Sequence, residues 1–179
     1  AILVKKPEDA LSLENFQKSW ELTISPLEAE ILWARMQDFK ERMERFNTNG
    51  TAIAHFLAAH SAVDHVYHAS LSSHLSFSTA KKLLSGNGGV VSFTLKDDSE
   101  KGLRSFYDKD FSSILKAPTI GSNQTLICPY PLLTHYFDTD AELEEIKLPR
   151  HLIRVAAGCE TEIDTILADL NHALRRTTQ

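Results

Sequence analysis

A helical hydrophobic period that starts near residue 26 constrains the fold of this chain more than any other feature. Ser25 is a good N-cap, Pro26 suits the first helical position and Glu28 completes a capping box. Apolar residues then recur at roughly helical spacing, at Leu27, Ile31, Met36, Phe39, Met43 and Phe46. Asn47–Gly50 interrupts this pattern, and Ile53 and Leu57 resume it. One continuous helix over 26–59 would be about 50 Å long, a length typical of a helix that joins two domains. The alternative is two helices that meet in a kink at Asn49–Gly50.

Composition places the chain among globular proteins. Its residues are 42% hydrophobic and 24% charged, as is usual for a globular protein. A length of 179 residues suits one domain, or one domain and a piece of another. Acidic residues outnumber basic ones by 24 to 19 and no basic stripe occurs, so no nucleic-acid partner is expected. No apolar run reaches the ~20 residues of a membrane helix. Two cysteines are too few for a disulfide scaffold, which favours a reduced, cytoplasmic setting.

The first four residues have the apolar pattern of a buried core strand. Ala1–Val4 is a short apolar run with no Met and no charged region before it, and Lys5-Lys6-Pro7 ends it. We therefore expect the whole chain to be the back part of a longer protein. A short helix is predicted from Pro7 to about Trp20.

After Ser61 strands and helices alternate. Strands are predicted at 63–67, 90–95, 124–128 and 152–156, and helices at 75–84, 99–108 and from 161 onward. This order predicts an α+β fold in which helices pack on one face of a small, mainly antiparallel sheet.

Histidines form a loose group between residues 55 and 68. His55, His60 and His65 are five residues apart, so on a helix they would point to different sides, and no acidic or cysteine ligand follows at a recognised interval. We expect surface or interface histidines here, including His68, and no metal site.

Two other patterns also favour structural roles. Cys128 and Cys159 lie in or beside predicted strands with no histidine partner nearby, which favours buried, inert thiols. The glycine-rich stretch Gly86–Gly89 precedes a strand and lacks a P-loop Lys-Ser/Thr, so it predicts a turn.

Arg154 is the unusual residue of the C-terminal strand Leu152–Ala156. A charge in the middle of an apolar strand is costly unless an anion compensates it. The planar guanidinium suits a bidentate grip on a carboxylate. The residues alone leave two possibilities, a structural salt bridge and the carboxylate of a ligand.

These segments together resemble the C-terminal part of the pyridoxal phosphate (PLP) enzymes of Cys/Met metabolism, and most of all fungal cystathionine gamma-synthases. The resemblance runs over nearly the whole chain. Its motifs are individually weak but occur in the family's order: AVDHVY at 62–67, SH at 73–74, GGVVSF at 88–93, TIG at 119–121, TH at 134–135 and LIRVAAGCE at 152–160.

The resemblance implies a domain organisation. Residues 1–25 would be the end of the large PLP-binding domain, 26–60 a long interdomain helix, and 61–179 the C-terminal small domain of a fold-type I PLP enzyme. The large domain of the same polypeptide would be one partner, and further copies of the chain the other, because tetramers are usual in the family.

The resemblance also assigns substrate contacts. The Arg of the family's LIRLSVG motif holds the substrate α-carboxylate, which implies that role for Arg154. The Ser of its SLG motif lies beside that carboxylate, and Thr119 stands there with a hydroxyl or a backbone group to offer. The chain departs from the family at Pro118, where many members have Glu, and at Ala156, where they have Ser.

The implied activity is transsulfuration, as in methionine biosynthesis: gamma-replacement on an O-acylhomoserine by cysteine. A cystathionine lyase or a gamma-substituting enzyme of specialised metabolism remains an alternative. The family's Schiff-base lysine and its PLP contacts would lie upstream of Ala1, so no catalytic or cofactor-binding residue is expected in this chain, and it would be inactive alone. A non-catalytic oligomerisation or binding domain is the third possibility.

Overall fold

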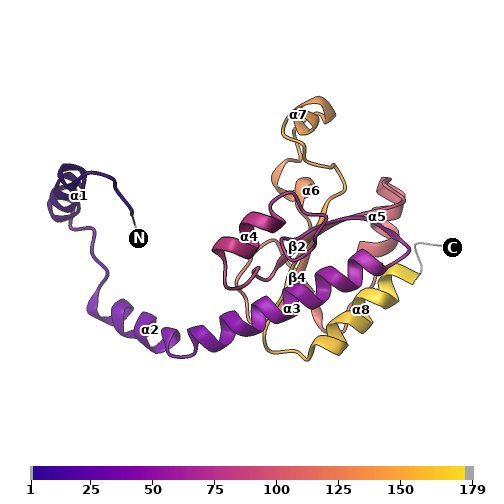
Figure 1. The fold of residues 1–179 in the computed structure, drawn as a ribbon, viewed down its shortest axis with the longest axis horizontal. Coiled ribbons are helices and arrows are strands. Elements are labelled where there is room, and N and C mark those ends of the chain that lie inside the picture. Colours follow the sequence, from indigo (N-terminus) through magenta and orange to yellow (C-terminus); the bar gives the residue numbers. More distant parts are fainter. Residues whose placement is uncertain (1, 176–179) are drawn as a thin grey trace. The chain divides into compact units, whose positions relative to one another are not determined.

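The computed structural model describes residues 2–175, which divide into two compact units, residues 2–39 and 40–175. The first unit contains α1 (Pro7–Ser19) and α2 (Pro26–Met36) (Figure 1). The capping box of α2 forms as predicted, since Ser25 Oγ accepts from the Glu28 N–H and the Glu28 carboxylate accepts from the Ser25 N–H. Neither helix buries a residue.

Two predictions for residues 1–60 are wrong. Residues 2–4 are not a strand, because a strand needs a neighbour to pair with and the described residues provide none there; Ala1 lies outside the described residues. The helical period 26–59 is divided between α2 and α3 (Phe39–Ala59), with a turn at Gln37–Asp38. Asn49–Gly50, the alternative kink, lies inside α3.

The asparagines of α3 explain why the helix continues past Asn47–Gly50. Asn47 Oδ1 accepts from the Gly88 N–H at 2.7 Å, and Asn49 Nδ2 donates to the Gly158 carbonyl at 2.8 Å. Both side chains therefore bind the backbone of neighbouring segments and do not compete with the helix's own hydrogen bonds. A side chain at Gly50 would lie 2.4 Å from the Gly88 carbonyl oxygen, so only glycine allows this approach.

The second unit is built on a five-stranded sheet in the order β1-β2-β5-β4-β3. The strands are β1 (Val63–Tyr67), β2 (Val90–Leu95), β3 (Ile114–Lys116), β4 (Thr125–Pro129) and β5 (Ile153–Ala156). All neighbours are antiparallel except β3 and β4, which are parallel. The predicted α+β fold with a mainly antiparallel sheet is confirmed.

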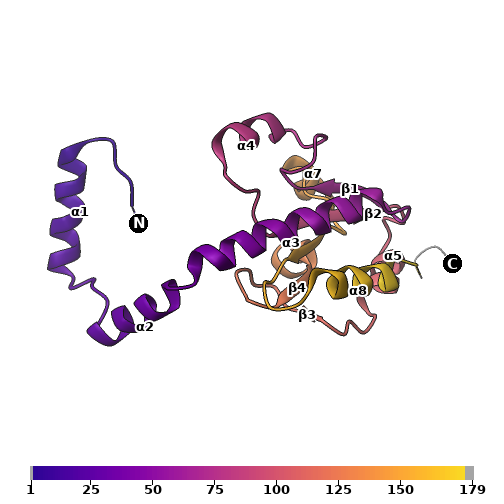
Figure 2. The same ribbon diagram turned by 60° about the horizontal axis from the view of Figure 1, so that its bottom comes forward.

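Helices α3, α5 (Glu100–Tyr107) and α8 (Ile163–Arg175) cover one face of this sheet. Figures 1 and 2 show α3 and α8 side by side across it. Alternate strand residues meet them in one apolar core: Val91, Phe93, Ile127, Ile153 and Val155 from the sheet, and Ile53, Leu57, Phe106, Ile166 and Leu170 from the helices. Phe93 and Phe106 pack edge to face, with their centroids 5.7 Å apart.

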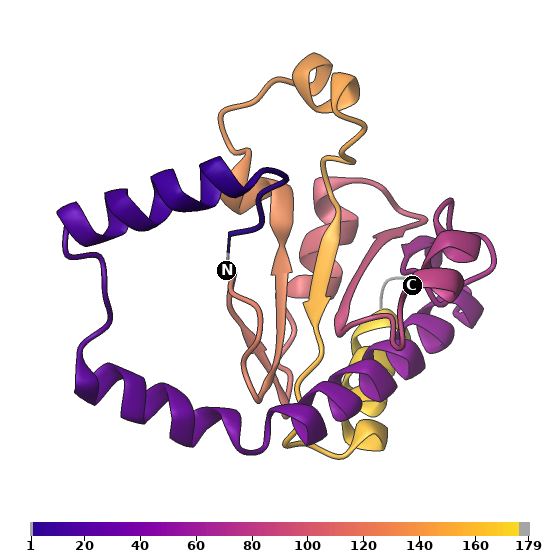
Figure 3. The ribbon, with the colours of Figure 1, turned by 60° about the vertical axis from the view of Figure 1, so that its left-hand side comes forward.

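Three shorter helices complete the unit, α4 (Phe77–Leu83), α6 (Tyr130–Thr134) and α7 (Asp140–Glu145). Figure 3 shows α7 beyond the end of the sheet. β3, α6 and α7 were not predicted from the sequence. The first two are very short, but α7 carries a readable signal, because Thr139 and Glu142 form a capping box.

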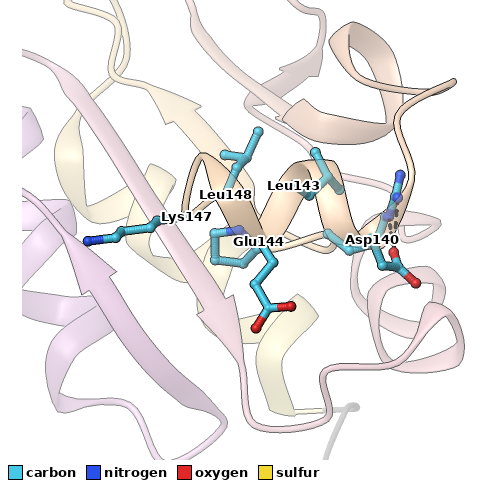
Figure 4. Close-up of a pocket in the computed structure, with 7 residues that line it drawn as sticks. Asp140, Leu143, Glu144, Lys147 and Leu148 are labelled. Carbon is cyan, nitrogen blue, oxygen red and sulfur yellow. Dashed lines mark hydrogen bonds and ion pairs between the residues drawn. The ribbon is translucent and has the colours of Figure 1, made fainter.

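Residues of α7 and of the turn that follows it line a shallow hollow (Figure 4). The Leu148 N–H donates to the Leu143 carbonyl at 2.9 Å and the Lys147 N–H to the Glu144 carbonyl at 3.0 Å, the pattern of a Schellman motif. Lys147 stands where glycine is usual and has a φ of 57°. Across the hollow Arg150 pairs with Asp140 at 2.9 Å.

We predict that Lys147→Gly stabilises the fold, because glycine adopts a positive φ without the steric cost of a Cβ. The free energy of unfolding should rise by about 0.5–1 kcal/mol in urea titrations. Lys147→Ala retains the Cβ and is the control. Equal stabilities of the glycine and alanine variants would contradict this account.

His68 is an exception to the expectation of surface histidines, since it is buried. Its Nδ1 accepts from the Ser70 N–H, which leaves Nε2 to donate to the Gly88 carbonyl at 3.3 Å. Burial lowers the pKa of His68, and the nearby His74 and His55 lower it further, although the bond to Gly88 raises it. The folded state therefore favours the neutral ring.

We predict that His68 makes stability depend on pH. Because its folded pKa is lowered, its stabilisation is complete above the unfolded pKa of about 6.5 and is lost as pH falls through the lower folded value. The stability difference between the wild type and His68→Gln should therefore shrink from pH 7 to pH 5 in urea titrations. The same substitution at the exposed His65 is the control, and a constant difference for His68→Gln would refute the prediction.

Candidate site: a guanidinium on the second face of the sheet

Arg154 lies on the face of the sheet opposite the three core helices. Its neighbours Ile153 and Val155 are fully buried in the core, so the alternation of the strand turns Arg154 the other way. Ser92 of β2 and Cys128 of β4 pair with Arg154 in register, one on each side. These three residues form a row across the middle of the sheet.

The structure brings Arg154 and Thr119 together. Arg154 Nη2 donates to the Thr119 carbonyl at 3.2 Å and also to the Pro118 carbonyl. The contact uses the backbone of Thr119, while its hydroxyl bonds weakly to the Ile120 carbonyl at 3.5 Å. The two residues expected to contact a substrate thus share one site.

Among residues 2–175 no carboxylate forms an ion pair with Arg154. Of the two possibilities that the sequence left open, the structural salt bridge is therefore not found in the described part of the chain. The guanidinium keeps a positive charge that an anionic ligand can meet. Its orientation is fixed by two carbonyl dipoles and by Tyr130, whose ring centroid lies 5.1 Å from Cζ.

Tyr130 and Cys128 lie at this site although the sequence predicted no role for Tyr130 and only a buried, inert thiol for Cys128. Strand alternation could have placed Cys128 beside Arg154, because the two residues are in register once β4 and β5 are paired. Tyr130 offered no such signal, because it follows β4 at the start of a helix that was not predicted.

Both cysteines are buried, as expected. Cys128 is 1% exposed and Cys159 is 6% exposed. Burial raises the pKa of the Cys128 thiol, and the nearby Arg154 offsets this only in part. Cys128 is therefore a neutral thiol at neutral pH.

We predict that neither thiol of the native protein reacts readily with DTNB at pH 7–8, because both are shielded and the Cys128 thiolate is scarce. Complete reaction should follow denaturation. A Cys159→Ser variant isolates the signal of Cys128. Rapid labelling of Cys128 in that native variant near neutral pH would show that its surroundings differ from those described.

The other candidate patterns do not assemble a site. The described residues include no group of three or more His, Cys, Asp or Glu side chains placed to hold a metal ion. Residues 86–89 form a loop that leads into β2. Among residues 2–175 no helix combines the length and the apolar character needed to cross a bilayer.

A family model described as Cys/Met metabolism PLP-dependent enzyme matches residues 1–175. The chain belongs to this family. The L-methionine gamma-lyase of Fusobacterium nucleatum is 31% identical over 86% of the chain and 38% of that protein. The cystathionine beta-lyase of Lactococcus lactis is 30% identical over 98% of the chain and 45% of that protein. The cystathionine gamma-synthase of Neurospora crassa is 33% identical over 83% of the chain and 24% of that protein.

Solved structures of the family share the fold. The crystal structure of cystathionine gamma synthase from Xanthomonas oryzae pv. oryzae, in complex with aminoacrylate and cysteine, matches with a TM-score of 0.86 and 26% identity. The match covers 98% of this chain and 45% of that one. This chain thus spans less than half the length of the relatives that it resembles.

No lysine of this chain is expected to form a Schiff base with PLP. A Schiff-base lysine needs an enclosed pocket that favours its neutral amine. Every lysine of the chain is exposed except Lys109, which is half-buried in the loop after α5. The expectation that no residue of this chain binds the cofactor stays a prediction.

Proposed function

We propose that this chain supplies the substrate-carboxylate site of a PLP-dependent transsulfuration enzyme, and that Arg154 binds the α-carboxylate of an amino-acid substrate. The observation that carries the proposal is a half-buried guanidinium that has no carboxylate partner among residues 2–175 and is held by carbonyls of the loop at Thr119. A guanidinium of this kind matches the geometry of a planar carboxylate. Membership of the Cys/Met metabolism family supports an amino-acid substrate.

In this proposal Arg154 acts by positioning. A carboxylate fixed at one point restricts the rotation of the substrate, so that the bond to be broken at Cα is presented in one orientation. PLP supplies an electron sink when it is bound. We propose that PLP is held outside these residues, in the large domain of the same polypeptide, and that this chain alone is inactive.

We propose gamma-replacement on an O-acylhomoserine by cysteine as the reaction. The similarity to the gamma-synthase of Neurospora crassa supports it. Similarity to the lyases of Fusobacterium nucleatum and Lactococcus lactis favours elimination as the second candidate. Steady-state assays with an O-acylhomoserine plus cysteine, against cystathionine and methionine, would decide between them.

Cofactor attachment can be tested on the protein from its natural source. Borohydride reduction followed by peptide mapping should find PLP fixed to a lysine outside residues 1–179. A protein that carries no reducible cofactor would refute the enzymatic proposal. It would instead favour a role in assembly, for which the exposed apolar side chains of α1 and α2, such as Phe16 and Trp33, provide a reason.

We predict that Arg154→Ala in the complete enzyme raises KM for the amino-acid substrate and lowers kcat/KM roughly 100-fold, because two charge-assisted hydrogen bonds are lost. Arg154→Lys keeps the charge but not the planar fork, and it should recover only part of the loss. Wild-type steady-state kinetics in Arg154→Ala would exclude the proposed role.

A further inference from the structure

Arg154 is supported by groups that stabilise a cation without neutralising it. Its Nη2 donates to the carbonyls of Pro118 and Thr119, and its Cζ lies 5.1 Å from the centroid of the Tyr130 ring. Carbonyl dipoles and the face of an aromatic ring attract a guanidinium, yet neither carries a net negative charge. The full positive charge of Arg154 therefore remains for a ligand.

Cys128 fits the same description. It pairs with Arg154 in register and is 1% exposed, so its side chain lies beneath the site. As a neutral thiol it does not compete with a ligand for the guanidinium. An acidic residue at this position would form the salt bridge that the site lacks.

The backbone fixes Tyr130 firmly. Tyr130 is the first residue of α6, directly after β4, and its N–H donates to the Leu152 carbonyl at 3.1 Å. Leu152 directly precedes β5, two residues before Arg154. The strand that carries the guanidinium thus also anchors the residue whose ring contacts it.

The Tyr130 ring contributes a cation–π contact rather than a hydrogen bond to Arg154. The ring is half-buried, and it contacts the His135 ring with centroids 6.0 Å apart. The carbonyls of Pro118 and Thr119 occupy Nη2, and the ring limits where the guanidinium can move. Guanidinium N–H donors other than those on Nη2 can then meet a planar anion.

We propose that Tyr130 is a positioning residue that holds the Arg154 guanidinium for the carboxylate of an α-amino acid. This inference rests on the proposed function, because it needs Arg154 to bind that carboxylate. It goes beyond that function by giving a role to the aromatic ring. The ring therefore favours ligands that have a planar carboxylate over ligands that have only the amine.

The test measures binding to the complete PLP-loaded enzyme by isothermal titration calorimetry, with L-alanine and L-alaninamide as probes. L-Alaninamide keeps the amine and replaces the carboxylate by a neutral amide. Tyr130→Leu and Tyr130→Met should weaken L-alanine binding roughly 3- to 10-fold, as expected for one lost cation–π contact, and leave L-alaninamide binding unchanged. Tyr130→Phe keeps the ring and should bind both probes like the wild type.

Arg154→Lys distinguishes a failure of the proposed function from a failure of the role of Tyr130. If it weakens L-alanine binding while Tyr130→Leu and Tyr130→Met do not, the role of Tyr130 is refuted and the proposed function stands. Equal weakening of both probes in the Tyr130 variants would mean a merely structural role and would also overturn the inference. If Arg154→Lys leaves L-alanine binding unchanged, the proposed function fails, and the role of Tyr130 fails with it.

Discussion

The alternation of β5 is the constraint on which the rest of the site depends. Ile153 and Val155 are fully buried against the helices, and a strand turns every second side chain to the opposite face. The face of the sheet on which Arg154 lies is therefore fixed. A register shift of one residue would put a guanidinium into the apolar core and move two aliphatic side chains out of it. The hydrophobic core thus determines the position of the charged group.

Charge balance then decides what Arg154 can do. In a protein interior a guanidinium ordinarily meets a carboxylate, yet here carbonyls, an aromatic ring and a neutral thiol surround it. Each of these groups lowers the cost of holding a cation away from water, and none removes its charge. The arrangement resembles a binding site that is prepared for an anion more than it resembles a stabilising salt bridge.

Sequence analysis located most elements where a local signal exists. The capping box at Ser25 and the N-cap at Ser99 predicted the correct starts of two helices, and the β-branched run of β2 predicted a strand, because these signals act over a few residues. It failed where the outcome depends on distant residues. The asparagines of α3 look like helix breakers until Gly88 and Gly158 are present to bind them, and the run at residues 2–4 looks like a strand until a partner is sought.

The sequence by itself determined the class of fold, the family and the unusual position of Arg154, because hydrophobic period, motif order and a charge within an apolar strand can all be read along the chain. Only the tertiary structure decided what surrounds that charge. Thr119, Cys128 and Tyr130 reach Arg154 through strand pairing and through the loop that precedes β4, and pairing depends on packing between segments far apart in sequence. The absence of a carboxylate partner in the described part of the chain is likewise a property of the folded arrangement, since the sequence contains many acids that could have filled that place.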